Sequence, residues 1–554
     1  MLCALSGAIA LAACSKVGAG PASTVTTASA AARHAWTRPG ELRIGIQREP
    51  NTLNPLLSAN TTEGLLNRLT FDTLVSVDAA GKHFVPILAA EVPSTANGGI
   101  SQDGLTITYK LRTGVKWHDG VPFTSKDVKF SWQAMMNDSN NVNSRVGYED
   151  VQNVDTPDDA TAVFHLKHKF APFVATVFSE SDDPVCIIPE HLLGKEKNVN
   201  NVAFNQAPVG TGPFKFVRWQ RADHIELVAN PDYFRGAPKL KSVTLKMIPD
   251  ENTEINTLRT HDIDWMFEPS PNLYLILRQI ERTGAIAIRM NDSPQTLALQ
   301  INTSRPALSD IRVRRAIAYV VDKKSLADKF TGGSALPAGA DQPPFSWSYE
   351  PKVMAYGPDP RTAVQLLRAA GYAPRADGIM VRDGQPLILQ LSTNNENATR
   401  RVVETQIQAM LRTAGIGADI KNYPANIFFR TYGQGGILTT GKYDLAVSGW
   451  IAGYDPDDHS LFQCDQIPRP SHPDGVNYTR YCSPEMDAAQ RAALATYDQS
   501  ARKAQYSTIQ KLIARDVPEI VIWYPRFPQA INPDFKGFAP NPVSEAWNAY
   551  EWEI

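Results

Sequence analysis

The segment GWIAGYDP, residues 449–456, holds side chains suited to gripping a small molecule. Trp450 and Tyr454 offer aromatic faces, which pack against apolar and peptide groups while their polar atoms can hydrogen-bond. Asp455 offers a carboxylate that can pair with a cation. The run DLAVSGW, residues 444–450, predicts a strand, and the segment continues from the end of that strand. These side chains would therefore lie together at a strand end. Such side chains could hold a ligand, and a core position is the alternative for Trp450.

Two other polar clusters follow predicted strands and are candidates for the same task. The first lies in the loop REPNTLNP after the strand predicted over residues 41–47, and the second follows the strand run LILQLST. The residues concerned are Glu49, Asn51 and Asn54 in the first cluster, and Asn394, Asn395, Glu396 and Arg401 in the second. Loops at strand ends commonly carry binding residues. Ordinary turn chemistry, and packing of the Arg401 stem on the following helix, are the alternatives.

No motif for catalysis or metal binding stands out. The sequence lacks a P-loop, a G-x-S-x-G, an H-E-x-x-H and a C-x-x-C. The acidic run DPDDH, residues 455–459, would need Gly in place of Ser460 and Glu in place of Gln466 to form an EF-hand. We therefore expect no catalytic residues, no bound metal and no cofactor. A carboxylate pair for glycoside hydrolysis stays open, because the separation of two carboxyl groups cannot be read from sequence.

The charge balance argues against two classes of partner. The 55 basic and 57 acidic residues give a formal net charge of −2. This near-neutral balance gives no electrostatic reason to expect nucleic acid or an anionic membrane surface as a partner. At 554 residues, the chain is long enough for several packed cores, about three or four by length alone.

Residues 1–14 indicate an export signal. A short apolar run, residues 4–13, ends in Leu-Ala-Ala directly before Cys14, which resembles a bacterial lipobox. We expect Cys14 to carry a lipid anchor, through which alone the chain would be held to a bacterial membrane. Residues 15–37 are rich in Ala, Ser, Thr and Gly without apolar periodicity, which predicts a disordered tether. No Lys or Arg precedes the apolar run, and an ordinary cleaved signal peptide is the alternative.

Three cysteines follow the leader: Cys186, Cys464 and Cys482. The last two flank a loop rich in Pro, Asn and Gly, and a disulfide between them would suit an exported protein. Closing a loop of this length would contribute about 3 kcal/mol. Two unrelated thiols are the alternative. Cys186 lies in an apolar run and is expected to be a buried core thiol.

The segment DGLTITYKLRTGVKWHDGVPFTSKDVKFSWQAMM, residues 103–136, predicts a strand, a tight turn and an amphipathic helix. Its first part alternates in side-chain character, as a half-buried strand does. Thr124 followed three residues later by an acidic side chain predicts a capping box. Val128, Trp132 and Met135 then fall on one helical stripe, which indicates a buried face.

From Asp310 the pattern turns helical. Residues 310–330 predict one helix capped by Asp310, and DPRTAVQLLRAAGY predicts a second that Gly371 stops. The runs LILQLST, RRVVETQIQAMLRTAGI, ADIKNY and DLAVSGW then read as strand, helix, strand and strand, which predicts an α/β lobe with its own sheet. The run EIVIWY, residues 519–524, is expected to bring the chain back toward the first lobe.

Five landmarks follow the order shown by the family 5 solute-binding proteins, and the chain resembles that family, the peptide and nickel receptors of ABC importers. They are residues 103–136 and the runs PVGTGPFKF, DIRVRRAIAYVVDK, AVQLLRAAGY and YDLAVSGW. The resemblance implies an α/β, two-lobed clamshell like that of periplasmic binding proteins (type II, cluster C), with an extra subdomain inserted in lobe I. Lobe I would comprise residues 38–300 and 524–554, with the inserted subdomain at about 65–190. Lobe II would comprise residues 301–523.

The resemblance also sets expectations for the ligand. In the family, the strand end that matches Trp450 borders the cleft, and the Trp commonly forms one wall of the ligand pocket. The first loop, which holds Glu49, Asn51 and Asn54 here, borders the pocket in relatives.

Peptide receptors of the family carry an Asp three residues after the Trp that matches Trp450, where it pairs with the ligand's α-ammonium; this chain has Gly453 there. Dipeptide receptors hold the ligand carboxylate with an Arg near the position of Thr393, for which Arg400 and Arg401 are distant substitutes. Strict dipeptide specificity is therefore disfavoured. A longer peptide held through its backbone, or a modified or non-peptide solute, stays open.

The resemblance implies a lipid-anchored extracytoplasmic receptor of an ABC importer, in the periplasm or on the cell surface. As a monomer it would capture peptides, either oligopeptides or modified peptides, between its lobes. It would deliver them to a membrane permease served by separate ATPase subunits. A receptor for a non-peptide solute, such as a sugar or a metal chelate, is one alternative. An extracytoplasmic hydrolase on a bilobed fold, and a sensor or adhesin without a transporter, are the others.

Overall fold

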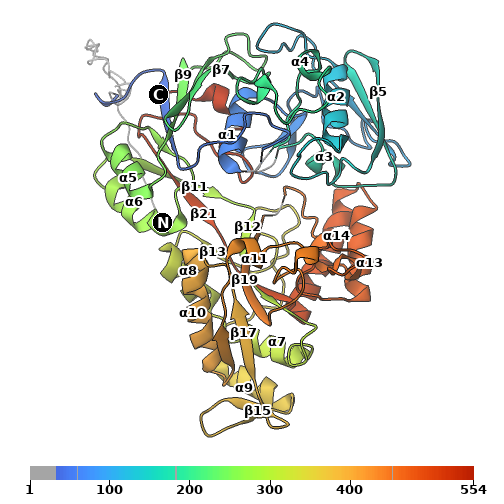
Figure 1. The fold of residues 1–554 in the computed structure, drawn as a ribbon, viewed down its shortest axis with the longest axis vertical. Helices are drawn as coiled ribbons and strands as arrows, with labels where there is room; N and C mark the ends of the chain where they lie inside the picture. Colours follow the sequence, from blue (N-terminus) through green and yellow to red (C-terminus); the bar gives the residue numbers. More distant parts are fainter. Residues whose placement is uncertain (1–32, 59, 181–183, 452) are drawn as a thin grey trace, which may run out of the picture.

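The computed structural model of the chain describes residues 33–58, 60–180, 184–451 and 453–554. These residues form two lobes, each built around its own mixed sheet with helices packed on it (Figure 1). The α/β, two-lobed clamshell expected from the sequence is confirmed. Across the described ranges, none of the helices is both long enough and apolar enough to cross a membrane. Cys14 and most of the expected tether lie outside the described residues.

The upper lobe is organised by a seven-stranded sheet in the order β11-β21-β10-β1-β9-β8-β7. Its strands are β1 (Glu41–Ile46), β7 (Phe214–Gln220), β8 (His224–Ala229), β9 (Ser242–Met247), β10 (Trp265–Met266), β11 (Ala287–Asp292) and β21 (Arg526–Ile531). β1 lies between β9 and β10 and is parallel to both, and this central position explains why every residue of the strand after Glu41 is buried. The helices on this sheet are α1 (Thr61–Thr70), α5 (Glu251–Arg259) and α6 (Tyr274–Glu281).

A second body of the upper lobe has a hydrophobic core of its own. Its elements are β2 (Val75–Val77), β3 (Phe84–Pro86), β4 (Thr106–Lys110), α2 (Ser125–Met136), β5 (Val151–Asp158), β6 (Thr161–Leu166), α3 (Phe173–Thr176) and α4 (Glu190–Leu193). The predicted capping box of α2 is confirmed, since the Asp127 carboxylate accepts from the Thr124 N–H at 2.8 Å. Val128 and Met135 are buried, whereas Trp132 is only half-buried. The expected inserted subdomain, about residues 65–190, falls in this region and stays a prediction.

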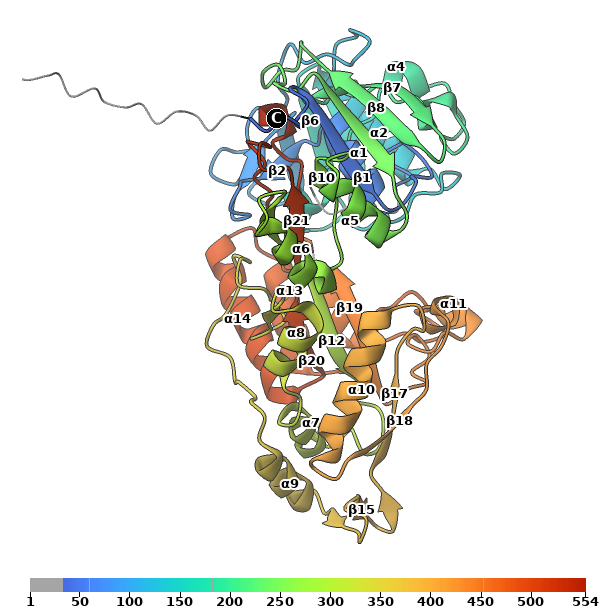
Figure 2. The same ribbon diagram turned by 90° about the vertical axis from the view of Figure 1, so that its left-hand side faces the viewer.

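The lower lobe is organised by a six-stranded sheet in the order β13-β20-β12-β19-β17-β18 (Figure 2). Its strands are β12 (Gln295–Ile301), β13 (Leu336–Pro337), β17 (Ile388–Ser392), β18 (Gly417–Ile420), β19 (Leu445–Ile451) and β20 (Glu519–Tyr524). A small sheet at the far tip of the lobe contains β14 (Ala373–Pro374), β15 (Met380–Arg382) and β16 (Gln385–Pro386).

The lobe boundary differs from the one expected at residue 300. β12 pairs along its length with β19 and also with β20, so it is a central strand of the lower sheet. The run EIVIWY is β20 and belongs to the same sheet, and the return to the upper lobe begins only with β21. An apolar strand pattern shows that a strand is buried on both faces, but it does not tell which of two sheets contains the strand.

Helices pack on both sides of the lower sheet. The helices of the lower lobe are α7 (Ile311–Ala318), α8 (Lys323–Thr331), α9 (Pro360–Ala369), α10 (Ala398–Arg412), α11 (Ala425–Phe428), α12 (His459–Phe462), α13 (Pro484–Leu494) and α14 (Gln499–Asp516). α8 and α10 contact strands of the sheet, whereas α9 packs on α7 and α13 on α14. The single helix expected over residues 310–330 is two helices, α7 and α8. α7 is capped by Asp310 as expected, but Asp322 caps a new helix, its carboxylate accepting from the Ser325 N–H at 3.0 Å.

The lobes are joined at two neighbouring junctions, residues 293–294 and residue 525. β11 and β21 pair in the upper sheet up to Asp292 opposite Arg526, while β12 and β20 pair in the lower sheet. The Arg526 Nε lies 2.6 Å from Asp292 Oδ1. The junctions therefore form one narrow connection in which the two crossing segments lie side by side.

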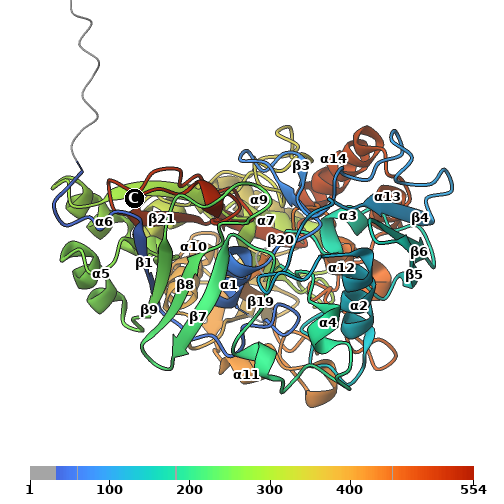
Figure 3. The same cartoon turned by 90° about the horizontal axis from the view of Figure 1, so that it is seen from above.

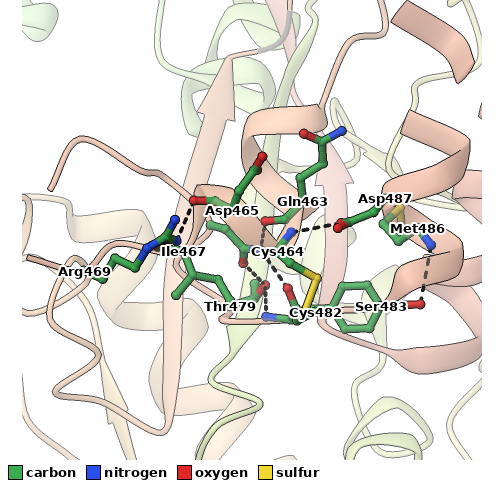
Figure 4. The surroundings of a disulfide bond; sticks show 12 residues. Gln463, Cys464, Asp465, Ile467, Arg469, Thr479, Cys482, Ser483, Met486 and Asp487 are labelled. Carbon is green, nitrogen blue, oxygen red and sulfur yellow. Dashed lines mark hydrogen bonds between the residues drawn. A yellow bond between two sulfur atoms is a disulfide. The ribbon is translucent and has the colours of Figure 1, made fainter. Parts of the chain in front are cut away.

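Cys464 and Cys482 form a disulfide between the end of α12 and the start of α13 (Figure 4). The Cys464 N–H donates to the Asp487 carboxylate at 2.9 Å, which attaches the bonded loop to α13. Cys186 is buried in the core of the upper lobe, as expected. The disulfide thus holds the loop that follows the DPDDH run against the α13–α14 pair.

Candidate ligand-binding cleft

A cavity of about 360 Å³, called the first cavity, lies between the lobes. Its volume falls in the range of about 300–1,000 Å³ typical of small-molecule sites. The ends of β12 and β19 and the start of α10 form much of its lower wall, and Pro271, Asn272 and Phe527 come from the upper lobe. A ligand in this cavity would therefore contact both lobes.

Aromatic side chains form the walls of the first cavity. The antiparallel register of β12 and β19 sets Trp450 opposite Thr296 at the cavity. Trp450 is 36% exposed, so a core position for this side chain is wrong. Phe429, which is 46% exposed, and Trp523 complete an apolar surface that suits peptide backbone and varied side chains.

Arg400 supplies the only charged side chain among the residues that line the first cavity in the described part of the chain. It lies in the first turn of α10, and its Nη1 donates to the Asn394 Oδ1 at 3.0 Å. Burial lowers the pKa of its guanidinium, although an arginine remains protonated at neutral pH. Because its charge is not neutralised by a carboxylate of the described residues, Arg400 is suited to bind an anionic group of a ligand.

Of the two arginines expected as substitutes for the family's carboxylate anchor, Arg400 lines the first cavity and Arg401, the one expected to contact the ligand, does not. Arg401 is exposed and does not line the first cavity. The helix cap gives the reason, since Asn397 caps α10 and its side chain accepts from the Arg400 N–H at 2.9 Å. A side chain in the first turn leans back toward the helix start, and for Arg400 the preceding strand end lies there. Recognising Asn397 as the cap was the signal that could have identified Arg400.

Asn394, Asn395 and Glu396 serve this cavity indirectly. Asn394 is buried, and its Nδ2 donates to Glu396 Oε2 at 3.3 Å while its oxygen orients Arg400. Glu396 accepts from the Ala425 N–H at 3.0 Å, and this bond lowers the pKa of its carboxyl group. Asn395 is exposed. None of the three lines the first cavity, and their place is beside Arg400, which Asn394 orients.

A second interlobe cavity, of about 380 Å³, lies beside α13 and α14, which sit beneath α3 and β3 of the upper lobe (Figures 1 and 3). From the upper lobe its lining includes Lys82, His83 and Phe84. From the lower lobe it includes Trp347, Tyr454, Asp455, Tyr497 and Arg502. Two of the predicted contact residues, Tyr454 and Asp455, therefore lie in this second cavity and not with Trp450.

Two tyrosines of the lower lobe hydrogen-bond across the cleft to the upper lobe. The Tyr454 hydroxyl donates to the Lys82 carbonyl at 2.6 Å, and its ring meets the edge of Phe84 at a centroid distance of 4.5 Å. The Tyr497 hydroxyl donates to the Gly104 carbonyl at 3.1 Å. Burial raises the pKa of both phenols, so they stay protonated donors at neutral pH. The lobes thus touch directly on the side of the second cavity.

Asp455 is already paired within the lower lobe. Its two oxygens accept from Arg502 Nη1 at 2.6 Å and Nη2 at 2.7 Å, and both side chains are buried. Burial alone would lower the pKa of the Arg502 guanidinium, and the adjacent carboxylate raises it instead. Asp455 was expected to face a ligand, but Arg502 bonds both of its oxygens and compensates its charge from within the lower lobe.

The residues expected from the first loop are also engaged inside the protein. Asn54 is fully buried and donates to Asn205 at 2.9 Å, so a ligand contact for Asn54 is wrong. Glu49 accepts from the Trp219 indole at 3.1 Å and from the Ala222 N–H at 3.2 Å. Asn51 is exposed, and like the other two it lines neither interlobe cavity. These residues fasten the first loop to its neighbours.

The remaining acids of the DPDDH run are bonded to side chains of the lower lobe. Asp457 lies 2.8 Å from the His459 ring nitrogen, and buried Asp458 accepts from Gln490 at 2.6 Å. In the part of the chain that the structure describes, no group of three or more His, Cys, Asp or Glu side chains is arranged to hold a metal ion. The run therefore contributes to the internal bonding of the lower lobe.

Solved structures share the fold of this chain over nearly its whole length. The oligopeptide-binding protein AppA from Bacillus subtilis in complex with a nonapeptide is 26% identical, covering 93% of this chain and 99% of the other, with a TM-score of 0.72. NikZ from Campylobacter jejuni in complex with Ni(L-His) is 27% identical, covering 94% and 100%, with a TM-score of 0.74. Both are ligand complexes, one of a peptide and one of a metal chelate.

Sequence relatives extend over nearly the whole chain. The AppA sequence is 27% identical over 93% of this chain and 91% of its own length. Di/tripeptide-binding protein 2 from Pseudomonas aeruginosa is 28% identical over 94% and 96%. The family described as bacterial extracellular solute-binding proteins, family 5 Middle, matches residues 83–466, well over half of the chain. The chain therefore belongs to the bacterial extracellular solute-binding proteins of family 5.

Proposed function

We propose that this protein captures peptides in its interlobe cleft and delivers them to the permease of an ABC importer, with Arg400 holding the ligand carboxylate. The observation that carries the proposal is the first cavity, where one guanidinium without a carboxylate partner among the described residues stands between aromatic walls. Relatives named for binding oligopeptides and di- or tripeptides support the peptide as ligand.

The cleft suits peptides of varied sequence. Aromatic faces such as Trp450 and Phe429 accept many side chains, and a guanidinium recognises the carboxylate that every free peptide end carries. Because the cavity is lined from both lobes, a bound peptide would favour the closed arrangement by its higher affinity for that state. Capture without chemical change is the proposed activity, and the closed form is the one that would dock the permease.

The attachment to the membrane is part of the proposal. Cys14 follows Leu-Ala-Ala at the end of a short apolar run, which supports a lipid anchor there. We propose that the anchored protein acts as a monomer in the periplasm or on the cell surface. Mass spectrometry of the N-terminal peptide from membrane fractions tests the anchor, and a peptide without lipid on Cys14 would contradict it.

Native mass spectrometry of the purified protein tests the ligand. The expected result is a population of bound masses that tandem spectra assign to peptides and that are released unchanged. Bound sugars or metal chelates would instead identify a non-peptide receptor, and shortened peptides after incubation would identify a hydrolase. Calorimetry with the identified peptides and with Arg400→Ala, which should bind them weakly, then locates the site.

A further inference from the structure

Two segments of the lower lobe meet at the second cavity: the 338–350 loop, which follows β13, and the DPDDH run. The Gln342 Nε2 donates to the Pro456 carbonyl at 3.4 Å, which bonds the loop to the run. Both segments also line the second cavity, the loop through Trp347 and the run through Asp455. Their attachment to each other therefore shapes the lower-lobe wall of this cavity.

Each segment carries a carboxyl group with buried oxygens that receive no hydrogen bond. In the described part of the chain, no donor makes a hydrogen bond of normal geometry to either oxygen of Asp341 or to Asp458 Oδ2. Asp458 Oδ1 accepts from Gln490 Nε2 at 2.6 Å. The Asp341 and Asp458 carboxyl groups are close enough to bond to each other. Such a bond requires a proton, because two ionised carboxylates are acceptors only.

The groups around the pair do not compensate a second negative charge. The titratable side chains that act on Asp341 or Asp458, or share a cavity with them, are Lys323, Asp457, Tyr506, Glu519 and Tyr524. The Lys323 ammonium donates to the Ala338 carbonyl, and burial lowers its pKa without an opposing effect of either aspartate.

The two other bases nearby are paired with acids of the DPDDH run. His459 bonds to Asp457 at 2.8 Å, and Arg502 bonds to Asp455. Across the described ranges, no basic side chain is therefore left to neutralise the pair, and Asp457 and Glu519 add negative charge around it.

We propose that Asp341 and Asp458 share one proton, and that this proton holds the 338–350 loop against the DPDDH run. Asp458 Oδ2 carries the proton and donates it to Asp341, since Gln490 already occupies Asp458 Oδ1. Burial raises the pKa of both carboxyl groups, and the charge of Asp341 raises that of Asp458 further. The pair titrates as one unit, so it keeps a proton at neutral pH.

Loss of the proton at alkaline pH leaves two buried like charges in contact, which repel each other. Because both pKa values are raised in the folded state, the stabilisation by the pair is present at low pH and is lost as the pH rises. The 338–350 loop should then separate from the DPDDH run, and with it Trp347 from its place in the wall of the second cavity.

Infrared spectroscopy of the full-length mature protein, with isotope-labelled aspartate, detects the proton directly. The parent at pH 7 should show a protonated carboxyl band that both Asp341→Asn and Asp458→Asn lack, because an amide donates to the remaining carboxylate without a proton. Asp465→Asn, at an exposed position nearby, is the control and should keep the band. Parent and variant spectra without this difference would overturn the proposal. So would one metal ion bound per chain that Asp341→Asn abolishes.

Hydrogen exchange of the 338–350 loop tests the consequence. Between pH 7 and 9, after correction for the intrinsic exchange rate, protection of the loop in the parent should fall by up to about tenfold per pH unit, the limit for loss of one proton. Asp341→Asn and Asp458→Asn should keep their protection over the same range. A parent loop whose protection does not change, or an equal loss in both variants, would overturn the role of the proton in holding the loop. Neither experiment involves the ligand, so its outcome is independent of peptide capture.

Discussion

Arg502 grips Asp455 at two points, with Nη1 and Nη2 lying 2.6 Å and 2.7 Å from the two carboxylate oxygens. The pair is buried in the lower lobe at the edge of the second cavity. This pairing affects the charge of the cleft, because Asp455 is the one acidic side chain among the described residues that line the two cavities. Its negative charge is compensated by Arg502 of the same lobe. The uncompensated charge of the cleft therefore belongs to Arg400 and Lys82.

Arg400→Ala should weaken binding of carboxylate-bearing peptides by about 2–5 kcal/mol, since it removes one partner of a desolvated charge pair. Calorimetry with a peptide and its C-terminal amide measures the effect, which should appear with the free acid and nearly vanish with the amide. Arg401→Ala is the matched control, because that neighbour is exposed and outside the cavity. Similar losses for Arg400→Ala and Arg401→Ala would show that Arg400 has no special role.

Asn394→Asp should also weaken binding, by about tenfold or roughly 1.4 kcal/mol. The new carboxylate would stand where the amide oxygen now accepts from Arg400 at 3.0 Å, and it would compete with the ligand for the guanidinium. The variant keeps the size of the side chain, so thermal stability serves as a check on folding. Asn395→Asp, at the exposed neighbouring position, should leave affinity unchanged. Tighter binding by Asn394→Asp would contradict a carboxylate site at Arg400.

Tyr454→Phe should loosen the ligand-free protein. It removes the hydrogen bond to the Lys82 carbonyl, worth about 0.5–1.5 kcal/mol, and keeps the ring contact with Phe84. Small-angle X-ray scattering should give a larger radius of gyration without ligand, and the affinity for peptide should fall by about two- to tenfold. Adding Tyr497→Phe, which removes the second interlobe bond, should increase both effects. Scattering curves identical to the parent for the double variant would show that these bonds do not hold the lobes together.

Loss of the disulfide should destabilise the lower lobe. Cys464 and Cys482 are 18 residues apart, and opening a loop of this length costs about 3 kcal/mol. The double variant Cys464→Ser/Cys482→Ser should unfold at lower urea concentration than the parent. Dithiothreitol should lower the midpoint of the parent toward that of the variant and leave the variant unchanged. A parent midpoint that reductant does not move would contradict the stabilising role of this bond.

Stability should fall with rising pH because of Glu254 in α5. Burial raises the pKa of this carboxyl group to about 8, opposed by a hydrogen bond from Gln47 and reinforced by nearby Glu251. Since the folded state holds the proton more tightly, this contribution is complete below pH about 4.5 and is lost as the pH approaches 8, on the order of 1 kcal/mol per pH unit. Urea unfolding at pH 5, 7 and 9 measures the slope.

Glu254→Gln should reduce that slope and make the protein more stable than the parent at pH 9, because the amide carries no charge to bury. A part of the slope should remain, since burial also raises the pKa of Glu519 to about 8. Glu91→Gln, at an exposed position, is the control and should keep the parent slope. A Glu254→Gln protein with the full pH dependence would assign the effect to another group.

The helices and strands could be predicted from local sequence patterns, whereas the pairing of strands into sheets could not. The capping box at Thr124 and the strand at residues 295–301 were readable because caps and apolar runs are local signals. The break between α7 and α8 was missed because an apolar stripe continues across it, and only the cap at Asp322 marks the new start. Whether β12 joins the upper or the lower sheet depends on pairing with strands more than 140 residues away.

The sequence indicated the region of the cleft better than it indicated which charged side chains line it. Trp450, which the resemblance places at the cleft, lines the first cavity, and its contact with a ligand stays a prediction. The acidic candidates were expected to face a ligand, but they bond to groups of the protein. A sequence does not show whether the partner of a carboxylate is a ligand or a distant residue such as Arg502, 47 positions from Asp455. Distant partners decide which charges remain open, and sequence spacing does not show them.

The paired crossing between the lobes limits how this protein can move. Two strands that stay joined above and below their junctions, with Arg526 fastened to Asp292 at the pivot, bend as a ribbon and resist twisting. Opening is then a rotation about a single axis. Different bound ligands would therefore close the protein to nearly the same shape. A transporter that recognises this closed shape can accept many different ligands without contacting the ligand itself.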